Sequence, residues 1–180
     1  MENKKALLVI DMQNDYLGSK RKAMFSYDAA ELTASVNRAI HRYQSDGADI
    51  LYIAHILPNI ATNRWFIGFS IRGTEGAKLY DGLDIVSELY FEKNLSNTYT
   101  AKKFREYMKE KKYDEVALCG LDECGCVGKT ALGAAKTGVR VVMLENCIGR
   151  RFPQERVNKM REQLKKKGVR YETAERKGED

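Results

Sequence analysis

Long hydrophobic runs are scarce in this chain of 180 residues. The first one covers only residues 6–10, because Asp11 interrupts it. A signal-peptide core needs roughly 7 to 15 apolar residues, and a membrane-spanning helix needs about 20. The sequence therefore predicts a cytoplasmic protein that does not enter a membrane.

Cysteine is also sparse, with Cys119, Cys124, Cys126 and Cys147 as the four examples. Secreted domains that depend on disulfides are small and dense in cysteine, so four clustered residues in a chain of this length indicate reduced thiols. A zinc site on the last three is not expected either, because they lack the paired C-x-x-C spacing of structural zinc sites.

The chain has no Pro- or Gly-rich linker, no internal repeat and no low-complexity tract. A length of 180 residues suits one core, so we expect a single domain over residues 1–180. The net charge of +6 gathers partly in residues 159–170, where Met160 and Leu164 recur at helical spacing. That pattern is typical of a solvated helix face. The sequence lacks the interleaved arginine and aromatic residues of a nucleic-acid-binding surface, so no nucleic-acid partner is predicted.

Continuous apolar runs recur along the chain, as expected for strands covered on both faces. They lie at residues 6–10, 50–54, 115–119 and 139–144, with a weaker strand at 88–93. Helical patterns separate them: a capping box of Asp28 and Glu31 begins one that Gly47 ends, and others cover about 101–108, 127–138 and 153–168. Alternating strands and helices predict an α/β fold with a mostly parallel sheet.

Three residues with chemically reactive side chains follow separate strands of this predicted sheet. Asp11 follows the first strand, Lys93 ends the weaker strand at 88–93, and Cys126 comes shortly after residues 115–119. Ligand crevices of parallel α/β sheets lie beyond the carboxyl ends of the strands, so we expect the three side chains to meet. Taken singly, each also has an ordinary structural interpretation: a packed thiol, a turn-capping carboxylate and a surface ion pair with Glu92.

A cysteine in this position needs activation, because a free thiol with a pKa near 8.5 is mostly protonated at neutral pH. Cys126 begins a predicted helix, and a helix amino terminus favours an anion. With an ammonium from Lys93 beside it, we expect the sulfur to lose its proton at neutral pH, with Asp11 as the proton acceptor.

Residues 55–87 do not fit the alternation and are longer than an ordinary connection. The segment carries Trp65, Phe66 and Phe69, which could line a pocket for a flat substrate or bury a contact between subunits. Both interpretations remain open from the sequence.

Four segments resemble the isochorismatase-like cysteine hydrolases, a superfamily that includes nicotinamidases, N-carbamoylsarcosine amidase and ureidoacrylate amidohydrolases. They are LLVIDMQNDYL at 7–17, RGTEGAKLYDGL at 72–83, EKNLSNTYT at 92–100 and GLDECGCVGKTALGAAKTG at 120–138, the last followed by VRVVMLENCIG. The resemblance covers about the first 150 residues. It implies a three-layer α/β/α sandwich with a Rossmann-like sheet.

The resemblance also implies a catalytic triad, which maps onto Asp11, Lys93 and Cys126. It implies a cis peptide bond between Leu121 and Asp122, and an oxyanion hole formed by the backbone N–H groups of Asp122 and Cys126. The implied reaction is hydrolysis of an amide, ureide or similar C–N bond in a small molecule, through a thioester on the cysteine. No cofactor is implied.

Gln13, His55, Trp65 and Tyr99 are the candidates for the substrate pocket. Tyr99 stands where the superfamily commonly has a phenylalanine, and His55 could equally be a structural residue. The resemblance also suggests a homo-oligomer, either a dimer or a tetramer. Nicotinamidases of the superfamily hold a metal ion with an aspartate and histidines after the second strand. Here that region offers only His55, since His41 falls on the first helix, so we predict no metal site.

Asp122, Glu123 and Cys124 depart from the small or hydroxyl residues usual before the nucleophile in this superfamily. Two carboxylates facing the sulfur would raise its pKa, so we expect them to point elsewhere or to bind a cationic substrate group. Cys124 could form a reversible, strained disulfide with Cys126, or could simply pack.

Two alternatives remain for the function. One is a redox-responsive or ligand-binding member of the same fold that catalyses nothing. The other is an isochorismatase, which cleaves a vinyl ether; the retained cysteine argues against it. The identity of the substrate is not predicted.

Overall fold

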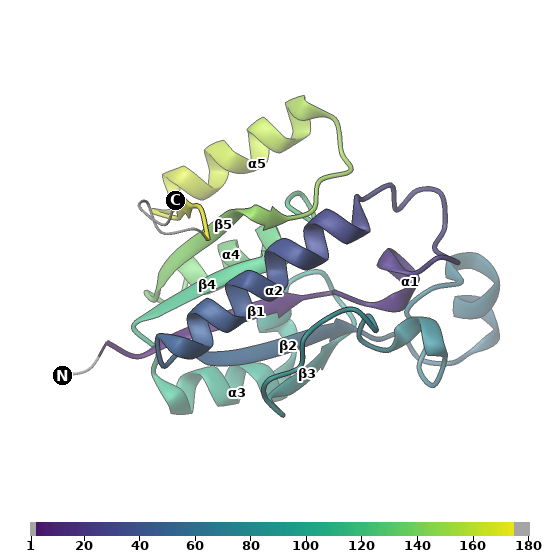
Figure 1. Ribbon diagram of the computed structural model, residues 1–180, viewed down its shortest axis with the longest axis horizontal. Helices are drawn as coiled ribbons and strands as arrows, with labels where there is room; N and C mark the ends of the chain where they lie inside the picture. Colours follow the sequence, from purple (N-terminus) through teal and green to yellow (C-terminus); the bar gives the residue numbers. More distant parts are fainter. Residues whose placement is uncertain (1–2, 175–180) are drawn as a thin grey trace.

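Six parallel strands form the centre of the protein in the computed structural model, which describes residues 3–174 (Figure 1). They are β1 (Lys5–Ile10), β2 (Asp49–His55), β3 (Tyr90–Lys93), β4 (Glu115–Gly120), β5 (Arg140–Ile148) and β6 (Arg170–Glu172). Their order across the sheet is β3-β2-β1-β4-β5-β6, and every neighbouring pair is parallel. The predicted α/β fold is confirmed, with the strand order of a Rossmann-like sheet.

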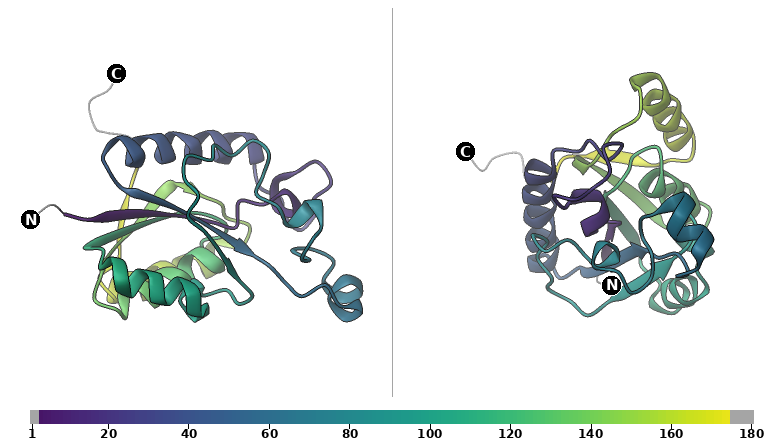
Figure 2. Two further views of the ribbon diagram at one scale, coloured as in Figure 1. Left: turned by 90° about the horizontal axis from the view of Figure 1, so that it is seen from below. Right: turned by 90° about the vertical axis from the view of Figure 1, so that its right-hand side faces the viewer.

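Helices cover both faces of this sheet, which makes three layers (Figure 2). The helix α2 (Ala29–Ser45) packs on one face, and α3 (Lys102–Lys111), α4 (Cys126–Ala135) and α5 (Gln154–Lys166) lie on the other. Successive side chains of each strand point to opposite faces. In β1, Leu7 and Val9 accordingly pack toward α2, whereas Ala6, Leu8 and Ile10 pack toward the other three helices.

Local sequence signals set the ends of α2 where they were predicted. The Asp28 carboxylate accepts a hydrogen bond from the Glu31 N–H at 3.0 Å, so it caps the first turn. Gly47, just past the last turn, adopts φ 76°, a conformation that glycine reaches without a steric cost. The helix buries Leu32, Val36 and Ile40 against the sheet.

Small side chains bring α4 close to its neighbours. Val127, Ala131 and Ala134 are fully buried, and Gly133 contacts the Asn97 amide so closely that a Cβ there would clash. The helix ends at Ala135, so the predicted extension of its apolar face to residue 138 is wrong: Gly138 lies in the following turn with φ 84°.

The structure contains elements that periodicity did not predict. β6 is a three-residue edge strand, and the helices α1 (Asn14–Leu17), η1 (Asn63–Ile67), η2 (Glu75–Ala77) and η3 (Thr98–Thr100) are single turns. Segments this short carry too few residues for a hydrophobic period. The η1 turn projects away from the sheet at one end of the molecule (Figure 2). Within residues 3–174, none of the helices has the length and apolarity needed to cross a membrane.

The strand order reverses between β1 and β4: β1, β2 and β3 follow one another toward one edge of the sheet, and β4, β5 and β6 toward the other. At such a switch point the loops leaving two adjacent strands diverge to opposite sides and leave a crevice. Residues that follow β1 and β4 are therefore the ones placed to line a site.

Candidate active site

A cleft of about 280 Å³ opens at this switch point, lined by residues that follow β1, β2, β4 and β5. Asp11 contributes from the end of β1. The loop between β4 and the start of α4 contributes Leu121, Asp122, Cys124, Gly125 and Cys126. The prediction that strand ends would gather the reactive residues agrees with this placement. Lys93, the last residue of β3, lies buried beneath the cleft rather than on its wall.

The backbone around Asp11 turns sharply as β1 ends. Asp11 adopts φ 55°, a left-handed conformation that Asp tolerates better than most residues. Its N–H donates to the Ile53 carbonyl at 2.8 Å, which fixes the turn against β2. On the other side Gly120, with φ 103°, runs so close to Ile10 that any Cβ would clash with the Ile10 carbonyl. Asp11 and Gly120 therefore determine how closely the loops that leave β1 and β4 approach each other.

Asp11 and Lys93 form a buried ion pair, with Lys93 Nζ 2.9 Å from Asp11 Oδ2. Their side chains are 4% and 0% exposed. The second carboxylate oxygen, Asp11 Oδ1, is buried and accepts no hydrogen bond from the described part of the chain. A buried carboxylate with an unused oxygen is chemically suited to accept a proton.

Cys126 is the first residue of α4, and its thiol interacts with both members of this pair. Burial, followed by the charge of Asp11, raises the pKa of Cys126 to about 12, and the ammonium of Lys93 only partly opposes this rise. The expectation of a thiolate at neutral pH is therefore wrong for the unliganded site. Desolvation and the charge of Asp11 together outweigh the ammonium of Lys93, so the sulfur rests as a thiol.

The pKa of Lys93 is raised as well, which for a lysine favours the charged form. Burial alone would lower the pKa of Lys93, but the charge of Asp11 and the interactions with Asp11 and Cys126 raise it above its ordinary value. Lys93 is therefore an ammonium at neutral pH and supplies one fixed positive charge to the site. That charge offsets the Asp11 carboxylate and any negative charge that develops on sulfur.

Two backbone N–H groups, at Asp122 and at the start of α4, are unused. Within residues 3–174, neither Asp122 N nor Cys126 N donates to a backbone or side-chain acceptor. The peptide bond between Leu121 and Asp122 is cis, at the position that the resemblance implied. Unpaired N–H groups next to a nucleophile can stabilise an oxyanion, each by a few kcal/mol at most.

The two acidic residues of the loop have separate environments. Glu123 is buried and bound to Arg161 at 2.6 Å, to Arg150 at 2.8 Å and to the Tyr171 hydroxyl at 3.0 Å. Its charge is therefore neutralised away from the cleft, as expected. Asp122 does line the cleft, where burial raises its pKa, and Oδ1 accepts a hydrogen bond from Cys124 N at 3.0 Å.

Cys124 lies on the cleft wall two residues before Cys126 and is 2% exposed. Burial, and then the charges of Asp122 and Glu123, raise the pKa of its thiol. All four cysteines are free thiols in the structure. Because disulfide exchange begins from a thiolate, these raised pKa values disfavour the redox alternative at neutral pH.

His55 lines the cleft at the end of β2, with both ring nitrogens engaged. Nδ1 lies 3.2 Å from the Tyr16 hydroxyl, and Nε2 lies 3.3 Å from the Asn94 carbonyl oxygen. Burial, the largest influence, lowers the pKa of His55, so the ring is neutral at pH 7. A neutral ring with the proton on Nε2 satisfies both contacts, and it fixes the wall of the cleft.

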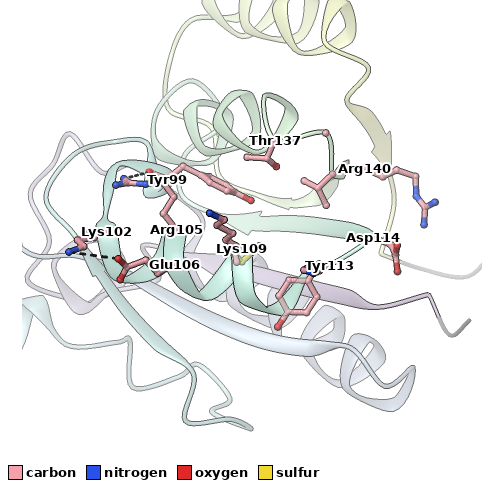
Figure 3. A pocket seen from close by; sticks show the side chains of 13 residues that line it. Tyr99, Lys102, Arg105, Glu106, Lys109, Tyr113, Asp114, Thr137 and Arg140 are labelled. Atoms are coloured by element: carbon pink, nitrogen blue, oxygen red, sulfur yellow. Dashed lines mark hydrogen bonds and ion pairs between the residues drawn. The ribbon is translucent and has the colours of Figure 1, made fainter.

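The other residues predicted for the substrate pocket lie elsewhere. Gln13 is fully buried, and its amide is spent on the backbone of His55 and Ala77. Trp65 sits on the projecting η1 turn, 84% exposed, away from the cleft lining. Tyr99 lines a separate groove (Figure 3). A motif fixes a residue's place in the chain, but the local backbone decides where its side chain points.

Much of the cleft is formed by residues that the sequence analysis did not select, together with Phe69, which it named as a possible pocket wall. An aromatic wall comes from Phe25, Tyr27, Phe69 and Phe152. Three basic residues, Lys129, Arg151 and Arg156, also line it. The Arg151 guanidinium lies over the Phe25 and Phe152 rings, 5.5 and 4.2 Å from their centroids. Arg151 and Phe152 follow β5, so the strand-end rule that found Asp11 could have indicated them.

The donor set near the cleft does not fit a resident metal ion. In the part of the chain that the structure describes, no group of three or more His, Cys, Asp or Glu side chains is arranged to hold one. His55 uses both nitrogens on protein groups, and the Asp11 carboxylate binds Lys93. No step of the chemistry below is therefore assigned to a metal.

Solved structures share this fold over nearly their whole length. N-carbamoylsarcosine amidase from Thermoplasma acidophilum superposes with a TM-score of 0.78 at 20% identity, covering 96% of this chain and 98% of that one. Pyrazinamidase of Pyrococcus horikoshii, solved in complex with zinc, gives a TM-score of 0.79 at 21% identity, covering 94% and 99%. At such identities the likeness establishes the fold.

Sequence comparison establishes the family. An uncharacterized isochorismatase family protein of Bacillus subtilis, YddQ, is 25% identical over 143 residues, which are 78% of this chain and 75% of the relative. The model of the Isochorismatase domain matches residues 5–176. That match spans the sheet, the loop that carries Cys126 and the helices on both faces. The chain therefore belongs to the isochorismatase domain family.

Proposed function

We propose that this protein is a metal-independent cysteine hydrolase that cleaves a C–N bond of a small amide or ureide. The observation that carries the proposal is the contact of the Cys126 thiol with the buried Asp11–Lys93 pair. A packed, inert cysteine would not need two ionised groups taken out of water beside it, since their burial is costly. The solved amidases of the same fold support a reaction of this class.

The first half of the reaction begins from the thiol. Cys126 attacks the substrate carbonyl carbon while its proton moves to Asp11, so the C–S bond and the Asp11 O–H bond form together. The carbonyl oxygen takes the negative charge and accepts hydrogen bonds from the N–H groups of Asp122 and Cys126. Asp11 then protonates the leaving nitrogen, the C–N bond breaks, and a thioester remains with release of ammonia or an amine.

Water completes the cycle in the second half. Asp11, again a carboxylate, accepts a proton from water, whose oxygen attacks the thioester carbon. The C–S bond breaks, the sulfur takes up the proton from Asp11, and the carboxylic or carbamic acid leaves. Lys93 stays charged throughout and holds Asp11 in place through their 2.9 Å contact.

The lining of the cleft supports an anionic substrate. Lys129, Arg151 and Arg156 add three positive charges. Against them stand Asp11, already paired with Lys93, and Asp122, which accepts backbone N–H bonds. With Glu123 bound to arginines, the expectation of a cationic substrate loses its support. The aromatic wall suits a flat or apolar body next to the scissile bond.

An ammonia-release screen over small amides and ureides tests the proposal. Replacement by Cys126→Ser should lower kcat at least about thousandfold on any substrate found, because a triad member is lost. Cys124→Ser is the matched control: it alters a thiol on the same cleft wall and should leave more than about a tenth of the activity. Equal loss in both variants, or an active Cys126→Ser, would refute a cysteine nucleophile.

Neither alternative from the sequence analysis gains an observation in its favour. A catalytically idle domain leaves the vacant Asp11 Oδ1 and the two unused N–H groups without a purpose. Vinyl-ether cleavage by an isochorismatase does not call for a thiol held between a carboxylate and an ammonium.

We also propose that the protein forms a homo-oligomer through the projecting turn. Trp65 and Phe66 are each 84% exposed there, an unusual exposure for two adjacent large aromatics. Trp65 is the one tryptophan of the chain, so its fluorescence reports this contact alone. Burial in an interface predicts blue-shifted emission that moves to the red on dilution or in a Phe66→Ser variant. Red emission at every concentration would contradict it.

A further inference from the structure

A second cavity lies at the other end of the sheet from the cleft. It is a groove of about 830 Å³ formed by α3, the residues that precede β4, and the turn between α4 and β5 (Figure 3). Asp114 and Arg140, at the amino-terminal ends of β4 and β5, line it. The cleft lies at the carboxyl-terminal ends, so no residue lines both cavities.

Tyr99 gives this groove an unsatisfied polar group. The residue belongs to η3 and is 8% exposed, with its ring edge-on to Phe104 at a centroid distance of 5.1 Å. Its ring extends into the groove (Figure 3). The hydroxyl oxygen is buried and has no hydrogen-bond partner among residues 3–174. Leaving a buried hydroxyl unpaired is unfavourable, so a group that supplies an acceptor would be bound favourably.

The charges around the groove are mostly positive. Its basic residues are Lys102, Arg105, Lys109, Lys112 and Arg140. Its two acids are engaged: Glu106 faces Lys102 at 3.8 Å, and Asp114 accepts a hydrogen bond from Lys4 N at 2.8 Å.

Lys109 and Lys112 are the uncommitted charges of the groove. Neither ammonium has an ion-pair or hydrogen-bond partner within the described residues. A solvated lysine pair by itself indicates nothing, because most surface lysines lack partners. Here the pair borders a cavity into which a buried, unpaired donor projects, and both kinds of group require an acceptor.

Apolar surface completes the groove. Met108, Tyr113 and Val139 line it beside the Tyr99 ring. The Tyr113 hydroxyl is already committed to the Asp49 carboxylate, so its ring can offer only a face or an edge. Thr137, the remaining hydroxyl, donates to the Ala134 carbonyl. The lining therefore offers apolar contacts and cationic donors, and it holds no cysteine, histidine or serine that could act as a nucleophile.

We propose that this groove is a second ligand site, separate from the active site, that binds a small organic anion. The apolar part of the ligand lies against Tyr99, Met108 and Val139. Its phosphate or carboxylate accepts hydrogen bonds from the Tyr99 hydroxyl and from the ammonium groups of Lys109 and Lys112. The site binds without catalysing a reaction.

Isothermal titration calorimetry with phenyl phosphate tests this proposal on the full chain, with phenol and inorganic phosphate titrated separately. Phenyl phosphate should bind at least about tenfold more tightly than either half, because the groove offers both kinds of contact. Binding no tighter than inorganic phosphate, or none up to about 10 mM, would overturn the proposal; that concentration corresponds to roughly 3 kcal/mol.

Variants locate the bound probe. Tyr99→Phe removes one oxygen and should weaken binding about tenfold, as expected for a hydrogen bond to a charged group. Lys109→Gln/Lys112→Gln should weaken it further. The matched control, Lys159→Gln/Lys166→Gln, removes the same charge from α5 outside the groove and should change nothing. Circular dichroism verifies that each variant is folded.

Two experimental outcomes would show that the groove is not a second ligand site. Binding that is lost in Arg151→Gln but unchanged in Lys109→Gln/Lys112→Gln would place the probe in the active-site cleft. Failure of the wild-type protein to bind, together with a change of oligomeric state in the groove variants by analytical ultracentrifugation, would make the groove an interface between copies. Either result overturns the proposed site.

Discussion

The two cavities lie at opposite ends of the same parallel strands and differ in how they hold charge. In the cleft of about 280 Å³, charged groups are buried and contact one another, as the 2.9 Å distance from Asp11 to Lys93 shows. In the groove of about 830 Å³, the lysines remain in solvent and a tyrosine hydroxyl is the buried polar group. The larger cavity is thus the one without reactive chemistry. Size alone does not locate an active site, whereas the convergence of desolvated ionisable groups does.

The largest contrast concerns the protonation of Cys126. With a pKa of about 12, its thiolate fraction rises tenfold per pH unit through the neutral range. Alkylation of Cys126 by iodoacetamide should therefore accelerate about a thousandfold between pH 7 and pH 10, because the thiolate is the reacting form. Mass spectrometry of the labelled peptide measures the rate, with Cys126→Ser as the blank. A plateau near pH 7 would instead indicate a stable thiolate.

The buried ion pair should dominate stability at the cleft. Lys93→Met leaves the Asp11 carboxylate buried without its partner and should lower the free energy of unfolding by about 3 to 5 kcal/mol. The double variant Asp11→Asn/Lys93→Met removes both charges and should recover most of that loss while remaining inactive. Urea denaturation measures all of these quantities.

An exposed pair gives the matched control for that cycle. Lys159 and Glu155 lie 2.7 Å apart on α5, with side chains 70% and 80% exposed. Breaking it with Lys159→Gln should cost no more than about 0.5 kcal/mol, because solvent screens the charges. Equal costs for the buried and exposed pairs would show that burial does not set the strength of the Asp11–Lys93 interaction.

A smaller effect is expected at the mouth of the cleft. Arg151→Gln keeps the backbone N–H bond to Asp122 but removes the guanidinium above Phe25 and Phe152. For an anionic substrate found in the screen, KM should rise about tenfold with kcat nearly unchanged, because a charge-assisted contact is lost. Lys136→Gln, at the opposite end of α4 from Cys126, is the control. If Arg151→Gln raised the KM of an uncharged substrate analogue by the same factor, recognition of an anion would be contradicted.

The smallest effect on catalysis is expected at Tyr99. Because its side chain lies in the groove, Tyr99→Phe should change kcat/KM by less than about twofold. Stability should stay equal or rise slightly, since the variant removes a buried hydroxyl that has no partner within residues 3–174. Thermal denaturation and steady-state kinetics measure the two quantities. A large loss of activity would place Tyr99 in the substrate pocket after all.

The rule that sites lie at the carboxyl ends of parallel strands predicted the residues whose position depends on the sheet topology. Asp11 and Cys126 could be predicted because β1 and β4 are continuous apolar runs, and residues after such strands meet at one edge. The same reasoning missed Arg151 and Phe152, because β5 continues to Ile148, four residues beyond the apolar run that marked it. Trp65 was misplaced for a different reason: its segment has no period, so nothing in it told the direction of the η1 turn.

The pKa of Cys126 could not be predicted from neighbours in the sequence. A helix start and a lysine both favour a thiolate, and both are present. Their effect depends on how much water remains around the sulfur, which only packing decides. The prediction from the sequence counted charges and omitted desolvation, and desolvation proved to be the larger influence.

By itself the sequence determined which residues sit at the ends of parallel strands, because hydrophobic runs and capping residues act over a few positions. That was enough for the order of strands and helices along the chain up to β5, and for the three groups of the proposed triad. The tertiary structure alone decided the directions of Gln13, Trp65 and Tyr99, the pairing of Glu123 with Arg150 and Arg161, and the protonation of Cys126. Those properties depend on which atoms exclude water from each group, and contacts between distant segments set that exclusion.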